Sequence, residues 1–196
     1  MGAPQQVLPP GPLRLSQPGR HSESRLVRHP DPAAKPRRAG ALRGPVGEGT
    51  VMTDLRFSDL RINDPLPTVE HAVSQDTIDL CAVAHLDYNP VHTDVEWCKD
   101  AQVFGTPKTV GHGMFTMTLM TSVILRAWRH ADAFVNSIEA KLTRPVEVGQ
   151  TLRCEGTVSE LHPRAPGKSF VVIGLTAFNA QGATVAVGQA QVTVPD

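Results

Sequence analysis

The sequence predicts an α+β domain in which an antiparallel β-sheet is wrapped around one long central helix. The helix is predicted by "TVGHGMFTMTLMTSVILRAW" (residues 109–128), a segment of helical length that is apolar on nearly every side. In a water-soluble domain, such a helix is a buried one. The sheet is predicted by the strand-like runs that follow, which are separated by short turn-forming stretches. One buried helix followed by a meander of strands favours a sheet curled around that helix.

The first elements expected along the chain are a strand and a helix. Residues 66–73, "LPTVEHAV", alternate loosely between apolar and polar side chains, which predicts a short strand. Ser74 then offers a hydroxyl to cap a helix, and Asp76 lies in its first turn, where the helix dipole favours a negative charge. We expect this helix over residues 75–84, with one apolar face formed by Ile78, Cys81 and Ala82.

The helix is expected to end near Asn89 and Pro90, because the residue before a proline is pushed out of helical geometry. The stretch "HLDYNPVHTD" (residues 85–94) is therefore predicted to be a helix end that leads into a stiff turn. A further short helix is expected around residues 94–101, "DVEWCKDA".

Strands account for the rest of the predicted fold. They are expected at residues 134–143, 151–161, 169–178 and 184–194. The first places Ile138, Ala140 and Leu142 on one face, and the second places Leu152, Cys154 and Val158 on one face. In the central helix, we expect Met114, Met117 and Met120 to fill the core.

The chain has no net charge, with 19 basic and 19 acidic residues, so no overall field draws it toward nucleic acid or an anionic membrane. The charge is unevenly distributed. Residues 1–51 hold eight basic and three acidic side chains, a net charge of +5, together with nine of the 17 prolines. Such a segment cannot bury enough surface to offset its ordering entropy, so we expect it to be disordered. Residues 52–196 are expected to form a single domain, and Met52 to be the native start of translation.

The three cysteines, Cys81, Cys98 and Cys154, are odd in number and widely spaced. They match neither a metal-binding clip nor a disulfide framework, which indicates a reducing compartment, and we expect the cytoplasm. A mitochondrial presequence is the alternative reading of the Arg-rich leader, although its prolines disfavour an amphipathic transit helix. No run is long and apolar enough to predict membrane insertion.

The stretch at residues 85–94 concentrates groups that handle protons. Asp87 and His92 are five residues apart, and the bend at Asn89 and Pro90 lets a carboxylate and an imidazole converge on one small site. Such a pair can hold a water molecule, with one group accepting its proton while the other supplies or relays one. Asn89 is a candidate for orienting the water or the histidine. Asp94 is expected to tether the turn by accepting hydrogen bonds from backbone N–H groups.

The start of the central helix supplies a second group. Gly113, in "GHGM", leaves its backbone N–H free and lets a ligand approach closely. A helix N-terminus favours negative charge, so this N–H is a suitable donor to a carbonyl oxygen that becomes an enolate. His112 is a candidate either for a helix cap or for a direct role. An acid–base pair with an oxyanion donor suits chemistry alpha and beta to a carbonyl.

These two motifs resemble the signature of the MaoC-like, R-specific enoyl-CoA hydratases, the hydratase 2 family. Members carry a D-x-N-P-(I/L/V)-H turn, like "DYNPVH" here, and later an apolar-H-G-(M/L) opening to a central helix, like "VGHGM". The stretch "LTRPVEVGQTL" is similar to their recurring strand with a P-V-x-x-G turn, and the resemblance covers roughly residues 66–194. The chain departs from the family at "HLD", where "SGD" is common. The bulkier His85 and Leu86 put the local packing and the substrate channel in question.

The resemblance implies a hotdog fold, and a homodimer or a heterodimer with a related hotdog subunit. It implies syn hydration of a trans-2-enoyl thioester to a (3R)-3-hydroxyacyl thioester, carried on CoA or acyl carrier protein and without a cofactor. By position, Asp87 and His92 would be the catalytic pair, Asn89 would help to hold the water, and the Gly113 N–H would bind the thioester carbonyl.

Other classes of function use the same residues. His92, Asp94 and His112 imitate the two-His-one-carboxylate set of non-haem iron enzymes, but His112 follows too soon in the chain for such a site, so no metal is expected. With the same hotdog fold, the chain would be an acyl-thioesterase or a non-catalytic, acyl-thioester-binding subunit of a heteromeric hydratase. The intact acid–base pair favours the hydratase over both.

Overall fold

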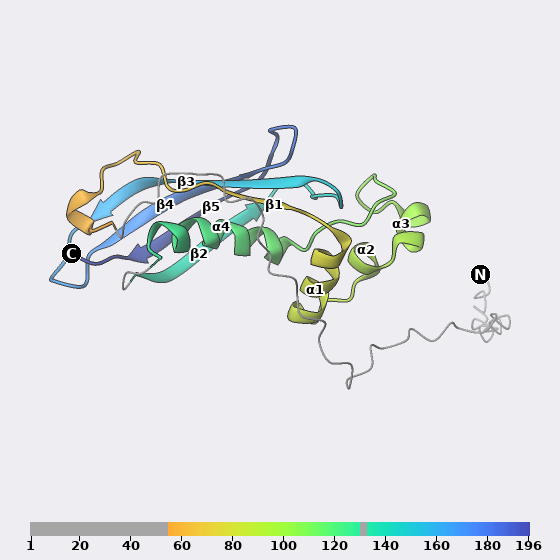
Figure 1. Ribbon diagram of the computed structural model, residues 1–196, viewed down its shortest axis with the longest axis horizontal. Coiled ribbons are helices and arrows are strands. Elements are labelled where there is room, and N and C mark those ends of the chain that lie inside the picture. The colour runs from red at the N-terminus through yellow and green to blue at the C-terminus, as the bar shows by residue number, and fades with distance from the viewer. Residues whose placement is uncertain (1–54, 130–132) are drawn as a thin grey trace, which may run out of the picture. The chain divides into compact units, whose positions relative to one another are not determined.

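The computed structural model describes residues 55–129 and 133–196. The segment expected to be disordered, residues 1–51, and the expected start at Met52 lie outside the described residues. Within these residues, the chain forms a five-stranded antiparallel sheet, one long helix and three short ones (Figure 1). A single 3-10 turn, Phe57–Asp59, precedes the first strand.

The strands lie in the order β1-β3-β4-β5-β2, and every neighbouring pair is antiparallel. Their bounds are Val69–Ala72 for β1, Phe134–Leu142 for β2, Thr151–His162 for β3, Phe170–Phe178 for β4 and Thr184–Thr193 for β5. The predicted strands are confirmed to within one or two residues, except that β1 is shorter than residues 66–73. The sequence alone did not predict the strand order, in which β2 pairs with the distant β5 and occupies an edge of the sheet.

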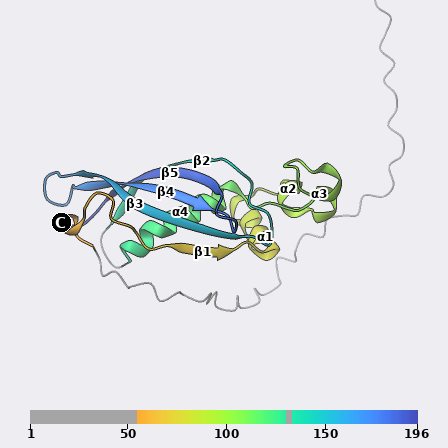
Figure 2. The same ribbon diagram turned by 90° about the horizontal axis from the view of Figure 1, so that it is seen from above.

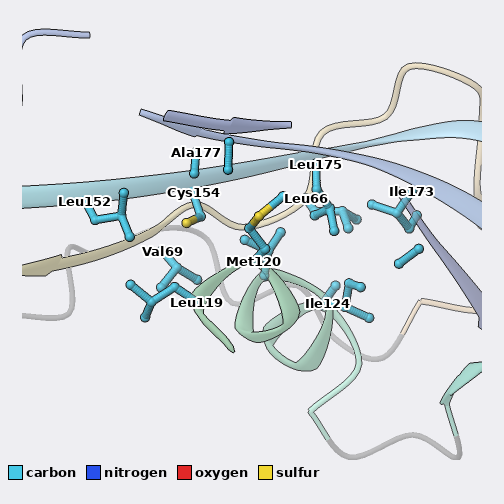
Figure 3. Close-up of a cluster of buried hydrophobic side chains, with 14 of the residues drawn as sticks. Leu66, Val69, Leu119, Met120, Ile124, Leu152, Cys154, Ile173, Leu175 and Ala177 are labelled. Atoms are coloured by element: carbon cyan, nitrogen blue, oxygen red, sulfur yellow. The ribbon is translucent and has the colours of Figure 1, made fainter. Parts of the chain in front are cut away.

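The core lies between the sheet and the long helix α4 (Gly113–Ala127). Leu152, Cys154 and Val158 of β3 are all buried, as the alternation predicted. Figure 3 shows Met120 of α4 pointing at the sheet, beneath the side chains that β3 and β4 contribute. The expectation of an α+β domain with an antiparallel sheet curled around a central helix is therefore confirmed.

The helix α4 is not buried on every side, however. Its sheet-facing side is buried, whereas Met114 and Leu125 on the other side are 54% and 57% exposed. The expectation of a helix buried all round is thus wrong for this single chain, and Met114 is not a core residue. The sheet covers only one side of the helix, so apolar residues on the opposite side have no cover from residues 55–129 and 133–196.

The helix α1 (Gln75–His85) begins as predicted, because the Ser74 hydroxyl accepts a hydrogen bond from the backbone N–H of Thr77. Ile78 and Ala82 are buried, while Cys81 is only partly buried. The helix ends at His85, before the Asn89–Pro90 boundary, because Leu86 adopts a left-handed conformation with φ of 56°. A left-handed residue is a common way to end a helix, although glycine is the usual choice there.

Two short helices follow, α2 (Pro90–Thr93) and α3 (Val95–Ala101), and the second is the one expected at residues 94–101. Pro90 begins α2, a position where its fixed φ suits a helix and its missing N–H has no consequence. Figures 1 and 2 show α1, α2 and α3 gathered at one end of the sheet. None of the described helices has the length and apolar character needed to cross a bilayer.

Candidate active site

Asp87 and His92 face each other, as the bend between them predicted. The Oδ2 atom of Asp87 lies 3.8 Å from Nε2 of His92. The Asp87 side chain is 50% exposed and that of His92 is 13% exposed, so one group is open to solvent and the other is held inside. A separation of 3.8 Å is too long for a direct hydrogen bond, but one water at about 2.8 Å from each atom fits beside the pair.

The backbone of Asp87 is held on both sides. Its N–H donates to the Ala82 carbonyl oxygen at 3.0 Å, which closes the end of α1 around the left-handed Leu86. Its carbonyl oxygen accepts a hydrogen bond from Nε2 of His112, also at 3.0 Å. The carboxylate therefore projects from a fixed segment of chain, although it is itself exposed.

The imidazole of His92 is oriented through its other nitrogen. The Nδ1 atom lies 2.7 Å from the carbonyl oxygen of Val110. Because a carbonyl can only accept, Nδ1 carries the hydrogen in the neutral ring, and the lone pair on Nε2 points to the Asp87 side. The backbone N–H of Val110 in turn donates to Val91, so the turn and the loop before α4 are joined beside His92.

His112 is buried and belongs to the site. Its side chain is 2% exposed, and its ring stacks on that of His92 with centroids 3.8 Å apart. It occupies the N-cap position of α4, but its side chain makes no capping hydrogen bond, so the cap expectation is wrong. Within the described residues, its buried Nδ1 has no hydrogen-bond partner, which fits a ring that donates through Nε2 alone.

Gly113 is the first residue of α4, so its backbone N–H has no carbonyl of the preceding turn to bond to. A Cβ on Gly113 would meet Cδ1 of Leu142 in β2, the end of a half-exposed side chain that can move aside. Packing is thus a minor reason for the glycine beside the ligand approach expected from the sequence. The helix dipole adds positive potential at this N–H.

Asn89 and Asp94 have structural roles in the turn. The side-chain oxygen of Asn89 accepts from the backbone N–H of Val91 at 3.2 Å and caps α2. Orientation of a water by Asn89 would therefore fall to its amide NH₂ group. Asp94 accepts from the backbone N–H of Trp97 at 2.9 Å and caps α3, as expected.

A metal-binding set is the competing reading of these side chains. Asp87, His92 and His112 each offer a ligand atom within 4.8 Å of the others, with Asp87 in the place that the sequence assigned to Asp94. The Nε2 atom of His112 donates to the Asp87 carbonyl oxygen, so only its buried Nδ1, which has no partner within the described residues, would keep a lone pair for an ion. The absence of a metal therefore stays an expectation from the sequence.

Two groups near the site were missed in the sequence. His85 lies edge-on to His112, with ring centroids 5.8 Å apart. From the sequence, His85 was noted only as a bulkier residue than the family usually has there. Gln75 accepts a hydrogen bond from the Thr109 hydroxyl and donates one to the backbone oxygen of His92. Their separation of 34 residues carries no periodic or motif signal, so sequence reasoning could not pair them.

Solved structures share this architecture. The R-hydratase PhaJ1 of Pseudomonas aeruginosa superposes with a TM-score of 0.64 at 23% identity, covering 73% of this chain and 87% of that one. An (R)-hydratase of A. caviae involved in PHA biosynthesis gives 0.61 at 18% identity, covering 69% and 98%. The ChsH1-ChsH2 complex of Mycobacterium tuberculosis gives 0.58 at 18% identity, covering 68% and 98%. The expected hotdog fold is confirmed.

Sequence comparison supports the same grouping. An (R)-specific enoyl-CoA hydratase of Rhodospirillum rubrum is 30% identical over 123 residues, which cover 63% of this chain and 81% of that protein. Residues 58–177, more than half of the chain, match the family model described as "MaoC like domain". They include the Asp87–His92 turn and the start of α4. The chain therefore belongs to the MaoC-like domain family.

Proposed function

We propose that the protein is an (R)-specific hydratase/dehydratase, which interconverts trans-2-enoyl thioesters and (3R)-3-hydroxyacyl thioesters. The observation that carries this proposal is the 3.8 Å separation of the Asp87 carboxylate from His92 Nε2. The His112 ring stacks on His92, and Gly113 follows it as the first residue of α4. The relative at 30% identity, named as an (R)-specific enoyl-CoA hydratase, supports the reaction class.

In this mechanism, a water molecule lies between Asp87 and His92. Its oxygen adds to C3 of the enoyl group while one of its protons passes to the pair. Charge then develops on the thioester oxygen, where the Gly113 N–H stabilises the enolate. Asn89 helps to orient the water through its amide NH₂ group.

The stereochemistry follows from the position of the two groups. With Asp87 as a carboxylate and His92 neutral, neither holds another proton suited to C2. The proton taken from the water is therefore the one returned to C2. Because one small site supplies both the oxygen and the proton, both add to the same face of the double bond. This is syn addition, and the reverse sequence is the dehydration.

The direct test is an assay with crotonyl-CoA, because it separates the three functions that the fold permits. Hydration removes the enoyl absorbance, releases no thiol and yields the (3R)-3-hydroxyacyl product. Release of CoA would instead identify a thioesterase, and binding without turnover would identify a non-catalytic subunit. Because the proposed mechanism needs no cofactor, full activity is expected after dialysis against a chelator. Parallel assays with CoA and acyl-carrier-protein thioesters decide the carrier.

We also propose that the active form is a homodimer, with a related hotdog subunit as the alternative partner. The edge strand β2 has a side with no neighbouring strand within the described residues, and the outer side of α4 exposes Met114 and Leu125. Light scattering on purified protein should give twice the chain mass. A monomer that is fully active would contradict this assembly.

A further inference from the structure

Gln75, the first residue of α1, makes three hydrogen bonds that meet beside His92. Its Nε2 donates to the backbone oxygen of His92 at 2.9 Å and to Oδ1 of Asp79 at 2.7 Å. Its Oε1 accepts from the hydroxyl of Thr109 at 2.5 Å. One half-buried amide thus links the start of α1, the turn that carries His92 and the loop before α4.

The two contacts of Gln75 outside α1 are with the two chain segments that meet at the His92 imidazole. One is the backbone of His92 itself. The other is Thr109, which is fully buried and directly precedes Val110, the residue whose carbonyl oxygen accepts from His92 Nδ1. Gln75 therefore adds a side-chain link between the histidine and the segment that orients its ring, beside the backbone bond from Val110 to Val91.

The loop before α4 has other attachments that maintain its fold without Gln75. The backbone N–H of Val148 donates to Thr109, and that of Gly111 donates to Val146, so the loop is fixed to the turn before β3. The Gln75 amide adds to these backbone bonds a side-chain link between the loop and the His92 backbone. Loss of the amide should consequently disturb the imidazole more than the domain.

We propose that Gln75 is a positioning residue for the proton-transfer pair, acting through His92 and Thr109. This inference rests on the proposed function for its kinetic consequence, but its structural consequence stands alone. By holding the His92 backbone against the Thr109–Val110 segment, Gln75 keeps the hydrogen on Nδ1 and the lone pair on Nε2, directed to Asp87.

The test uses Gln75→Met, which keeps the length of the side chain and removes its three hydrogen bonds. Gln102→Asn is the matched control, because the Gln102 amide also bonds to a backbone oxygen, that of Lys99, but lies at the end of α3. The first readout is the ¹⁵N NMR spectrum of the His92 ring without substrate. We expect the Nδ1–H form in the wild type and the control, and a mixture of tautomers in Gln75→Met.

The second readout is the hydration of crotonyl-CoA. Because a misplaced catalytic group lowers the rate of chemistry, we expect kcat to fall about 10- to 100-fold in Gln75→Met with KM little changed. Thr109→Val removes a single bond and should give a smaller change in the same direction, which keeps the test decisive if Gln75→Met folds poorly. An unchanged His92 spectrum in folded Gln75→Met or Thr109→Val would overturn the inference. The two proposals can fail separately. If Gln75→Met has altered His92 tautomers but the wild-type protein does not hydrate crotonyl-CoA, the positioning role is supported and the proposed function is refuted.

Discussion

Nε2 of His112 lies 3.0 Å from the main-chain oxygen of Asp87, so a buried histidine before α4 holds the backbone of the turn 25 residues earlier in the chain. The same ring stacks on His92. His112 therefore contacts both members of the proposed pair, one through a hydrogen bond and the other through its face. It is best described as a residue that positions the pair.

Replacing His112 with phenylalanine should separate these two contacts. The ring and its stacking on His92 are kept, but the hydrogen bond to Asp87 is lost. A net hydrogen bond contributes about 1 kcal/mol, so we expect a loss of stability of that size in urea unfolding. We also expect kcat to fall by about tenfold, because Asp87 is less well placed. A variant with wild-type stability and kcat would show that the hydrogen bond from His112 to Asp87 contributes to neither stability nor catalysis.

Leu86 should be replaceable by glycine with a gain in stability. It has a φ of 56° and is 79% exposed, so a strained backbone position is not compensated by burial against the part of the chain that the structure describes. The left-handed conformation costs a non-glycine residue about 1–2 kcal/mol, part of which the greater flexibility of unfolded glycine offsets. We expect Leu86→Gly to raise the free energy of unfolding by about 0.5–1 kcal/mol.

Leu86→Ala is the matched control, because it removes the exposed side chain but keeps the Cβ atom. It should show no comparable gain in a thermal or urea unfolding experiment. If alanine stabilises the protein as much as glycine does, exposed apolar surface and not backbone strain is the cause. A loss of stability in Leu86→Gly would mean that the leucine packs against something outside the described chain.

The two reasons for a glycine at position 113 can be separated by a double substitution. Gly113→Ala places a Cβ against the end of the half-exposed Leu142 side chain, which can rotate aside, so we expect a loss of stability below about 1 kcal/mol. Leu142→Ala removes the clash, so stability should return in the double variant. Hydratase activity should stay low, because the added methyl group still obstructs the Gly113 N–H. If the double variant recovered activity as well as stability, a glycine would be needed at position 113 only to avoid contact with Leu142.

Cys154 should make the protein sensitive to alkaline pH. Burial raises the pKa of its thiol from 9.0 to about 12, so the folded chain keeps a neutral thiol where the unfolded chain ionises. Below about pH 9 the thiol is neutral in both states and the free energy of unfolding is at its full value. As the pH rises from 9 toward 12, only the unfolded chain loses this proton, so the free energy of unfolding falls. Urea unfolding between pH 8 and pH 10.5 should show a steeper decline for the wild type than for Cys154→Ala. Parallel curves would contradict this effect.

Most of the fold could be predicted because its local signals agree. The alternation that buries Leu152 and Cys154 marked β3, and the Ser74 hydroxyl marked the start of α1. Besides the strand order, two further features could not be predicted. The exposure of Met114 depends on where the sheet ends around α4, and the early end of α1 depends on Leu86 adopting a conformation that the residue type disfavours.

The candidate site was predictable where it is local in sequence. The approach of Asp87 and His92 follows from one bend between them. The contact of His112 with Asp87 and the bridge from Gln75 to Thr109 depend on tertiary packing between segments 25 and 34 residues apart. Asn89 and Asp94 were recognised as part of the turn, but only the structure shows that both cap helices.

The central claim is that the Asp87 carboxylate and the His92 imidazole act together on one water. Its most direct test is the rate of crotonyl-CoA hydration by Asp87→Asn and His92→Ala. The controls are Asp100→Asn and His162→Ala, which change the same residue types away from the turn, at an exposed and a half-buried position respectively. We expect each site variant to lose about 10²- to 10⁴-fold in kcat while folding normally, and each control to keep its rate. Near-normal turnover in either folded site variant would contradict the claim.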